Sequence, residues 1–374
     1  MTHRQQERPA RRMIIPFFIS NRGCPHRCAF CRGATGSNGG PQTLTFPAME
    51  DTVLRYLSTA RPGKKSFVQI AFYGGNFTGL DTLEQDTLLE WAGRFIEAGA
   101  IQSVRISTRP DFIGRQEIRR LKESRVETVE IGAQSMVDDV LHLSRRGHTA
   151  EDVRQAVGTL KENGFETGVH LMAGLPGDSR DRFLYSVDEA ARLKPDLVRI
   201  HPVLVFANTA LAEACGNGDY VPLSMDEAID LCGIALRRFE RAGIRVVRIG
   251  LQPEGDMERP GVIMGGPYHP AFRTLVEAAL FFEMASRLLA SVPGKGAKAI
   301  FTVSPGDHSF FRGLNNANME PLKVRAFPAV VAVTTDPGLR RGTVRLDLDN
   351  HCREIHRTSQ SVFIPGRDGD LEDV

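Results

Sequence analysis

Short apolar runs alternate with amphipathic stretches of helical period along most of this 374-residue chain. This alternation predicts repeated strand and helix units with a parallel sheet, because parallel neighbours need a crossover connection. The predicted strands cover residues 14–19, 67–73, 103–107, 128–131, 167–172, 197–201 and 246–249. The predicted helices cover residues 48–57, 83–98, 115–124, 137–143, 150–163, 180–193 and 225–242. The pattern predicts an α/β fold, a partial (β/α)6 TIM-type barrel, with a doubly wound open sheet as the alternative.

The chain divides into four predicted segments. A basic, disordered tail covers residues 1–12, the barrel residues 13–285, a small C-terminal α/β domain residues 286–365, and an acidic, disordered tail residues 366–374. The C-terminal domain is predicted from apolar runs at 299–303, 329–334 and 342–348, with a polar turn or short helix at 304–319. It would serve either as a polar face for an RNA backbone or as a lid on the barrel.

Composition limits the classes of protein to consider. The net charge is +2, with 41% hydrophobic and 25% charged residues, which is ordinary for a globular protein and gives no general polyanion-binding footprint. No apolar run approaches the roughly 18 residues needed to cross a bilayer, so we expect no membrane association. Cys215, Cys232 and Cys352 have no paired spacing, and the N-terminus has no apolar signal core. These features indicate a reducing compartment and predict a cytoplasmic protein.

Three cysteines follow the first predicted strand as Cys24-x3-Cys28-x2-Cys31. Three close thiolates can hold three irons of a cubane cluster and leave the fourth iron free for another ligand. Zinc is the main alternative, since it accepts three cysteines and a histidine and His26 lies inside the loop. However, His26 is only two residues from both Cys24 and Cys28, which is awkward for a fourth tetrahedral ligand. The loop therefore favours an iron–sulfur cluster that binds something at its open iron.

Glycine and polar residues end the second and third predicted strands, where the working groups of such barrels lie. Gly74 and Gly75 lack side chains, so the backbone can approach a ligand closely, with an ordinary tight turn as the alternative. Ser107 and Arg109 precede a proline at the end of strand three. A hydroxyl suits a ribose, and a guanidinium can clamp a carboxylate. A solvated surface turn is the alternative for Arg109.

The fourth and fifth strand ends carry further candidates. Glu130 and Gln134 bracket a glycine on an otherwise apolar strand, where a buried carboxylate or amide needs a partner. That partner is either a bound ligand or, for Glu130, a salt bridge to another strand end. Arg146 is a candidate for the carboxylate of a ligand, and His148 is a weaker candidate. His170 is placed to touch a substrate.

Several motifs together resemble the radical S-adenosylmethionine (radical SAM) superfamily, and in particular the radical SAM core of the elongator catalytic subunit and its bacterial relatives. Besides the cysteines, they are YGGNFTGL (73–80), STRPD (107–111), VEIGAQS (129–135), RGHT (146–149), HLMAGLPG (170–177) and GGPYHPAF (265–272). The resemblance covers about residues 14–285. It implies a [4Fe-4S] cluster on Cys24, Cys28 and Cys31, with SAM chelated at the open iron and cleaved to a 5′-deoxyadenosyl radical.

The resemblance also implies SAM contacts and partners. The glycine pair would line the methionine amine, and the expected SAM contacts are Gly74, Gly75, Asn76, Ser107, Arg109, Glu130, Gln134 and Arg146. The implied partners are tRNA, modified at its wobble uridine, and an electron donor such as ferredoxin or flavodoxin. No residue is assigned a catalytic role.

The chain also departs from the elongator subunit. Only about a dozen residues precede strand one, fewer than a hundred follow residue 285, and Asn76 replaces the more usual small or hydroxyl residue. We therefore do not carry acetyl transfer over from the resemblance to this chain. The leading expectation is a radical SAM enzyme acting on RNA. The alternatives are a radical SAM enzyme acting on a small molecule or tetrapyrrole, like coproporphyrinogen oxidase, and a non-catalytic iron–sulfur or zinc protein.

Overall fold

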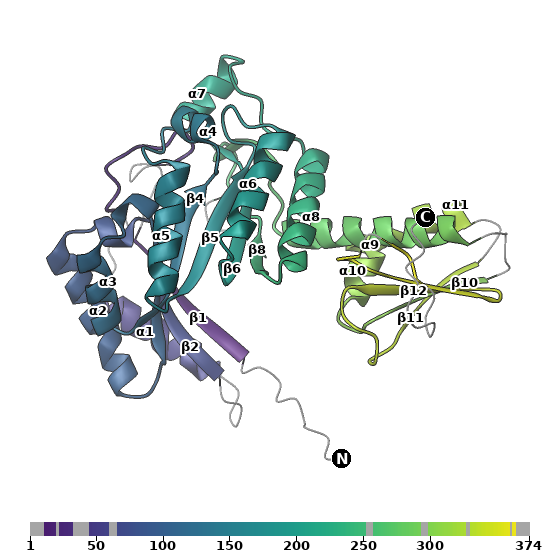
Figure 1. The fold of residues 1–374 in the computed structure, drawn as a ribbon, viewed down its shortest axis with the longest axis horizontal. Coiled ribbons are helices and arrows are strands. Elements are labelled where there is room, and N and C mark those ends of the chain that lie inside the picture. The colour runs from purple at the N-terminus through teal and green to yellow at the C-terminus, as the bar shows by residue number, and fades with distance from the viewer. Residues whose placement is uncertain are drawn as a thin grey trace. The chain divides into compact units, whose positions relative to one another are not determined.

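A computed structural model of the chain describes residues 11–19, 22–32, 45–59, 66–251, 257–292, 298–326, 330–359 and 361–363 (Figure 1). Contacts divide the chain into two units. The first contains residues 1–199, 204–221 and 254–265, and the second contains residues 200–203, 222–253 and 266–374. The predicted boundary after residue 285 instead falls inside a long helix of the second unit. The two predicted tails lie almost wholly outside the described residues, although residues 11 and 12 already belong to the first strand.

The main sheet has seven strands in the order β1-β2-β3-β4-β5-β6-β8. They are β1 (Arg11–Phe18), β2 (Ser66–Tyr73), β3 (Ser103–Thr108), β4 (Val126–Gln134), β5 (Glu166–Ala173), β6 (Leu197–Pro202) and β8 (Arg245–Ile249). The pairs from β1 to β5 are parallel. Because the order follows the chain without reversal, the sheet is a curled partial barrel and not a doubly wound sheet. The predicted fold class is confirmed.

The helices that alternate with these strands begin and end within a few residues of the predicted positions. They are α1 (Phe46–Ser58), α2 (Thr82–Glu97), α3 (Arg115–Glu123), α4 (Asp138–Leu143), α5 (Ala150–Glu162), α6 (Arg180–Arg192) and α8 (Met225–Arg241). Thr149 and Ser224 form complete capping boxes with Asp152 and Glu227. Shorter elements not predicted from sequence are α7 (Ala210–Gly216), the 3-10 turns η1 (Phe77–Gly79) and η2 (Pro110–Phe112), and the antiparallel pair β7 (Val205–Phe206) and β9 (Ile263–Gly265).

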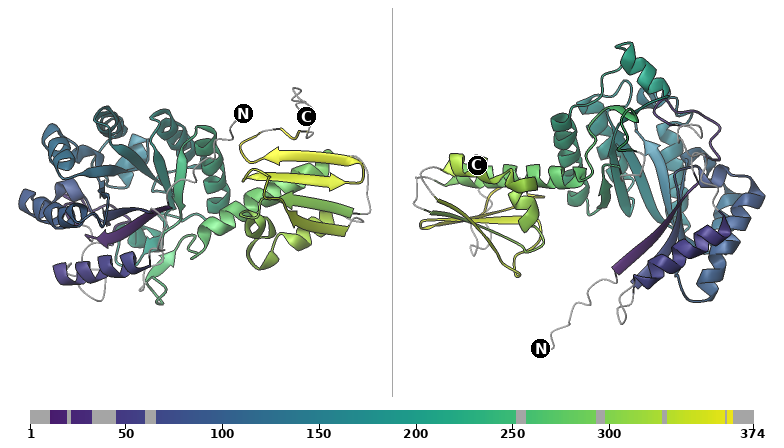
Figure 2. Two further views of the ribbon diagram at one scale, coloured as in Figure 1. Left: turned by 90° about the horizontal axis from the view of Figure 1, so that it is seen from below. Right: turned by 180° about the vertical axis from the view of Figure 1, so that it is seen from behind.

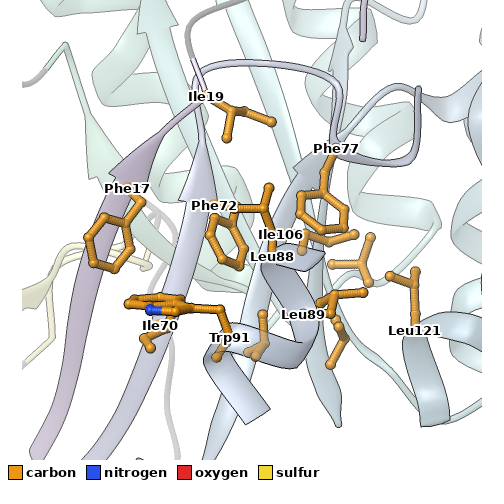
Figure 3. Close-up of a cluster of buried hydrophobic side chains, with 14 of the residues drawn as sticks. Phe17, Ile19, Ile70, Phe72, Phe77, Leu88, Leu89, Trp91, Ile106 and Leu121 are labelled. Atoms are coloured by element: carbon orange, nitrogen blue, oxygen red, sulfur yellow. The ribbon is translucent and has the colours of Figure 1, made fainter. Parts of the chain in front are cut away.

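One face of the sheet packs against the helices and is apolar. Trp91 of α2 lies edge-on to Phe17 of β1, with ring centroids 5.4 Å apart, and Phe72 of β2 stacks on Phe77 of η1 (Figure 3). Each large apolar side chain fully buried there contributes about 1.5–3 kcal/mol. Side chains alternate along a strand, so the residues between these apolar positions point to the opposite face. That face carries polar and charged residues.

The second unit contains a four-stranded sheet in the order β11-β10-β12-β13. Its strands are β10 (Lys298–Val303), β11 (Val330–Thr335), β12 (Thr343–Leu348) and β13 (His351–His356), and its helical elements are α9 (Phe272–Ser291), α10 (His308–Arg312), η3 (Leu314–Asn316) and α11 (Met319–Ala326). Helix α9 runs along one face of this sheet (Figure 2), where Phe281 joins a core with Phe301 and Phe311. The small C-terminal α/β part is as predicted, whereas α9 and β13 are not predicted from sequence.

No helix among the described residues is long and apolar enough to cross a membrane.

Candidate functional site

The cysteine loop after β1 brings its three thiols near two arginines. Cys24 is exposed, Cys28 is buried and Cys31 is intermediate. Burial raises the pKa of the Cys24 thiol, and the thiols of Cys28 and Cys31 raise it further, whereas the guanidinium groups of Arg109 and Arg146 lower it. Electrostatic effects of this kind require proximity. The loop therefore gathers three potential cluster ligands beside two positive charges.

Backbone hydrogen bonds fix the loop to distant parts of the chain. The amide of Ala29 donates to the carbonyl of Ser144 at 3.0 Å, and the amide of Leu211 donates to the carbonyl of Ala29 at 2.9 Å. Gly23, directly before Cys24, has a φ of +74°, and an added Cβ would lie 2.3 Å from the carbonyl oxygen of Asn76. Only glycine fits this close approach.

Asn76 joins the cysteine loop to the ends of β2 and β3. Its side chain is fully buried. Its Nδ2 donates to the carbonyl of Gly23 at 2.8 Å, while its Oδ1 accepts from Thr108 Oγ1 at 2.6 Å and from the amide of Arg109 at 3.1 Å. The sequence predicts Asn76 as a SAM contact. In the structure, its amide oxygen and nitrogen are bonded to protein groups that position the loop.

The glycine pair lies in the turn after β2. Gly74 has a φ of +80°, which favours glycine. An added Cβ at Gly75 would lie 2.9 Å from both the carbonyl oxygen of Arg22 and Cγ1 of Ile19. Gly75 therefore lets the segment that leads into the cysteine loop pack directly on the turn.

The end of β4 is irregular and anchors Arg146. The register with β5 shifts between Ile131 and Gln134, and Gln134 has a φ of +69°. Arg146 donates from Nη2 to the carbonyl of Gly132 at 2.7 Å, and from Nη1 to the sulfur of Cys28 at 3.1 Å. One side chain thus connects the bulged strand end to a cysteine of the loop.

His148 binds the neighbouring carbonyl of the same bulge. Its Nε2 lies 3.2 Å from the carbonyl oxygen of Ala133. Because a carbonyl only accepts, we assign the proton to Nε2, which leaves Nδ1 as an acceptor. Burial lowers the pKa of His148 to about 4, and the charges of Arg146 and Arg109 lower it as well. The imidazole is therefore neutral at pH 7.

Four buried polar atoms around these strand ends have no hydrogen-bond partner in the part of the chain that the structure describes. They are Ser107 Oγ, Arg109 Nη1, Arg146 Nε and His148 Nδ1. Arg109 also forms a two-point ion pair with Asp111, at 2.9 and 2.8 Å. Leaving a buried polar group without a partner costs about 1–3 kcal/mol. The set offers guanidinium N–H donors, a hydroxyl and one acceptor, which suits a ligand with a carboxylate, hydroxyls and amino groups.

Glu130 lies in a second cluster, on the polar face of the sheet, and both of its oxygens have protein partners. Oε1 accepts from Arg105 at 2.7 Å, from Tyr73 at 3.0 Å and from Arg199 Nη2 at 3.0 Å. Oε2 lies 2.5 Å from both His170 Nε2 and Arg199 Nε. Burial alone would raise the pKa of Glu130, but hydrogen bonds and charge from His170 and Arg199 hold it well below its usual range. These contacts match the salt-bridge alternative that the sequence leaves open.

The Glu130 cluster contains residues that sequence reasoning misses. Tyr73, Arg105 and Arg199 are not among the predicted site residues. Burial raises the pKa of Tyr73, and the charge of Glu130 raises it further, so its hydroxyl stays protonated. The available signal is the alternation itself, since polar residues at every second position of a strand, as in Ser103, Arg105 and Ser107, mark a polar inner face.

Gln134 and His26 complete the predicted set. At Gly132, an added Cβ would lie 3.1 Å from Gln134 Nε2, so that amide lies beside the β4 bulge. An added Cβ at Gly147 would lie 2.5 Å from Nε2 of His26, so the imidazole packs on that glycine. Among the described residues, no three His, Cys, Asp or Glu side chains are grouped to hold a metal ion. A cubane differs in geometry, because each cysteine binds a separate iron.

Comparisons with known proteins place this geometry in context. Residues 18–190 match the profile of the Radical SAM superfamily, and residues 195–281 match the Radical_SAM C-terminal domain. The tRNA uridine(34) acetyltransferase of Methanocaldococcus jannaschii is 28% identical over 261 residues, covering 59% of this chain and 48% of the relative. Elongator complex protein 3 of Dictyostelium discoideum is 26% identical over 260 residues, covering 58% and 46%. The chain thus spans about half the length of these relatives, and the predicted resemblance is confirmed.

A solved structure gives the same fold. The archaeal Elp3 of Methanocaldococcus infernus, with an N-terminal deletion, superposes with a TM-score of 0.57 and 24% identity, covering 72% of this chain and 63% of that one.

Proposed function

Since this chain belongs to the radical SAM superfamily of enzymes, we propose that it cleaves S-adenosylmethionine reductively and acts on tRNA. The observation that supports the proposal is the 3.1 Å contact of Arg146 with Cys28 of the cysteine loop, together with buried polar atoms of Arg146 and of nearby strand ends that lack a partner among the described residues. This chemistry requires thiolates that hold the cluster and, close to them, polar groups that bind SAM. The superfamily uses a [4Fe-4S] cluster together with SAM.

We assign the cluster to Cys24, Cys28 and Cys31. When bound, a cluster with one open iron supplies an electron to SAM and so gives access to the 5′-deoxyadenosyl radical. The protein's part is to hold the loop in place, through Asn76 and the backbone bonds of Ala29. An electron donor such as ferredoxin or flavodoxin would reduce the enzyme.

We assign Ser107 and Arg109 to SAM. Arg109 Nη1 and Ser107 Oγ have no partner among the described residues, and the first suits the methionine carboxylate whereas the second suits a ribose hydroxyl. Gly74 and Gly75 would admit the methionine amine. The side-chain amide of Gln134 lies beside Gly132, in the bulge at the end of β4. The predicted contacts from Asn76 and Glu130 remain proposals, although the side chains of both residues already form hydrogen bonds to protein atoms.

Anaerobic reconstitution tests the enzyme claim. We expect the wild-type protein to take up iron and sulfide and, with SAM and dithionite, to release 5′-deoxyadenosine and methionine. Replacement of Cys24, Cys28 and Cys31 by alanine should abolish both, whereas Cys215→Ala should not. An intact cluster that yields neither product would contradict the proposal.

tRNA is supported as substrate by the relatives that bear the name tRNA uridine(34) acetyltransferase. We do not extend acetyl transfer to this chain. Filter binding of the protein to total tRNA should show an affinity that falls steeply with salt, because phosphate contacts release counterions. Indifference to RNA, with a small molecule retained during anaerobic purification, would favour a metabolite substrate instead.

A further inference from the structure

Arg146 makes a contact with a cysteine sulfur that the SAM-binding role predicted from sequence does not explain. Its Nη1 donates to Cys28 Sγ at 3.1 Å, and both side chains are more than nine-tenths buried, with 6% and 8% of their surface exposed. Burial keeps solvent from screening the positive charge. The sulfur would therefore carry a charge-assisted hydrogen bond whatever it binds.

The position of the guanidinium is fixed by the chain around it. Nη2 is held by the carbonyl of Gly132 at 2.7 Å, in the bulge of β4. Arg145 and Gly147 on either side have φ values of +55° and +70°, so Arg146 projects from a tight turn after α4. Its backbone amide donates to the carbonyl of Leu141 at 2.9 Å. The donor is thus held in place before any cofactor binds.

We propose that Arg146 sets the reduction potential of the iron–sulfur cluster by donating to the sulfur of Cys28. The inference rests on the cluster assigned under Proposed function. Adding an electron to a cluster increases the negative charge on its sulfurs, and a fixed cationic donor stabilises that reduced form. Arg146 is a positioning and tuning residue here: it makes the one-electron reduction easier without taking part in bond breaking.

The test measures the potential of reconstituted, SAM-free protein by an anaerobic titration followed by electron paramagnetic resonance. In Arg146→Gln, we expect the ratio of reduced to oxidised cluster at a fixed ambient potential to fall about tenfold, which for one electron corresponds to about 59 mV. Arg146→Lys keeps the charge but loses the two-armed geometry, so its shift should be smaller. Arg119→Gln, an exposed change of equal charge on α3, should leave the potential unchanged.

A second measurement uses the wild-type protein alone. With ¹⁵N-labelled arginine, electron–nuclear double resonance of the reduced cluster should detect a nearby guanidinium nitrogen, and Arg146→Lys should remove that signal. An unchanged potential in fully loaded Arg146→Gln, or the absence of the ¹⁵N coupling in the wild type, overturns this role. Because neither readout uses SAM, such a result would leave the proposed function standing. A wild-type protein that assembles no cluster overturns both.

Discussion

Two groups of buried polar residues occupy the same curled sheet and differ in one respect. Around Glu130, the arginines, the tyrosine and the histidine all reach the carboxylate. Around Ser107 and Arg109, polar atoms are just as buried, but Ser107 Oγ and Arg109 Nη1 lack partners among the described residues, although the rest of the Arg109 guanidinium pairs with Asp111. Burial of a polar group is costly without a partner, so the first group stabilises the fold by itself and the second requires something further. The difference separates a group that is paired within the protein from the group that we propose as the SAM site.

The largest expected effect comes from breaking the paired group. Glu130→Ala leaves Arg105 and Arg199 without their shared carboxylate, and removing one partner of a buried pair costs about 3–5 kcal/mol. Urea unfolding of the purified protein measures the loss. Glu127→Ala, an exposed position on the same strand, should cost far less. Equal stability of both variants would show that the cluster does not support the fold.

His148 should make stability depend on pH. Its pKa is about 4 in the folded protein and 6.5 without perturbation. Below pH 6.5 the unfolded chain binds a proton at this histidine, whereas the folded chain does not bind it until the pH falls to about 4. The contribution of the neutral imidazole to the free energy of unfolding is therefore complete above pH 6.5. It is lost as the pH falls, by up to about 3 kcal/mol at pH 4. His148→Gln keeps a donor for the Ala133 carbonyl but cannot titrate, so its unfolding free energy should fall less over this range. If the unfolding free energies of the wild type and of His148→Gln fell equally over this pH range, the lowered pKa of His148 would be refuted.

A substitution at Arg109 tests the group of buried polar atoms that lack partners among the described residues. Arg109→Gln removes a charged donor that we assign to the SAM carboxylate, and hydrogen bonds to charged groups are worth about 1.5–3 kcal/mol. The dissociation constant of SAM, measured by calorimetry on the reconstituted protein, should rise by roughly 10- to 100-fold. Arg119→Gln serves as the exposed control. Normal SAM binding by Arg109→Gln would mean that Arg109 serves only its ion pair with Asp111 and does not bind SAM.

The smallest effect sharpens the comparison on a single strand. Ser103 and Ser107 lie on the same face of β3, but Ser103 Oγ accepts from Gln69 at 2.9 Å, whereas Ser107 Oγ has no partner in the described structure. Ser107→Ala should weaken SAM binding by about 0.5–1.5 kcal/mol and leave unfolding unchanged, and Ser103→Ala should do the reverse. The same outcome for both serines would erase the distinction.

Much of the barrel follows from local patterns. The strands of the main sheet and helices α1 to α6 and α8 are predicted because of their apolar periodicity, and the caps at Thr149 and Ser224 mark helix starts directly. Helix α9 escapes prediction because its first half packs on α8 through Val276 and Leu280 and its second half packs on the C-terminal sheet, which weakens the helical period of its apolar residues. Strand β13 alternates only weakly, with polar residues at most of its positions.

The site was predicted less evenly. The positions of the cysteines, Ser107 and Arg109 at the ends of predicted strands follow from the sequence pattern, whereas their roles toward a ligand stay predictions. Asn76 and Arg146 show the limit, since a side chain that reaches a carbonyl 53 residues away, or a sulfur 118 residues away, leaves no local trace. Such contacts depend on the register of strands that are distant in sequence.

The sequence alone determined the thiol spacing, the alternation of strands and helices that gives the partial barrel, and the polar residue types at the strand ends, because each is encoded within a short window. Only the tertiary structure decided which buried charges neutralise one another and which stay unmatched. That choice depends on atoms brought within 3 Å of each other by strand pairing, as with Arg105 and Glu130 at 2.7 Å, and a linear pattern does not contain such distances.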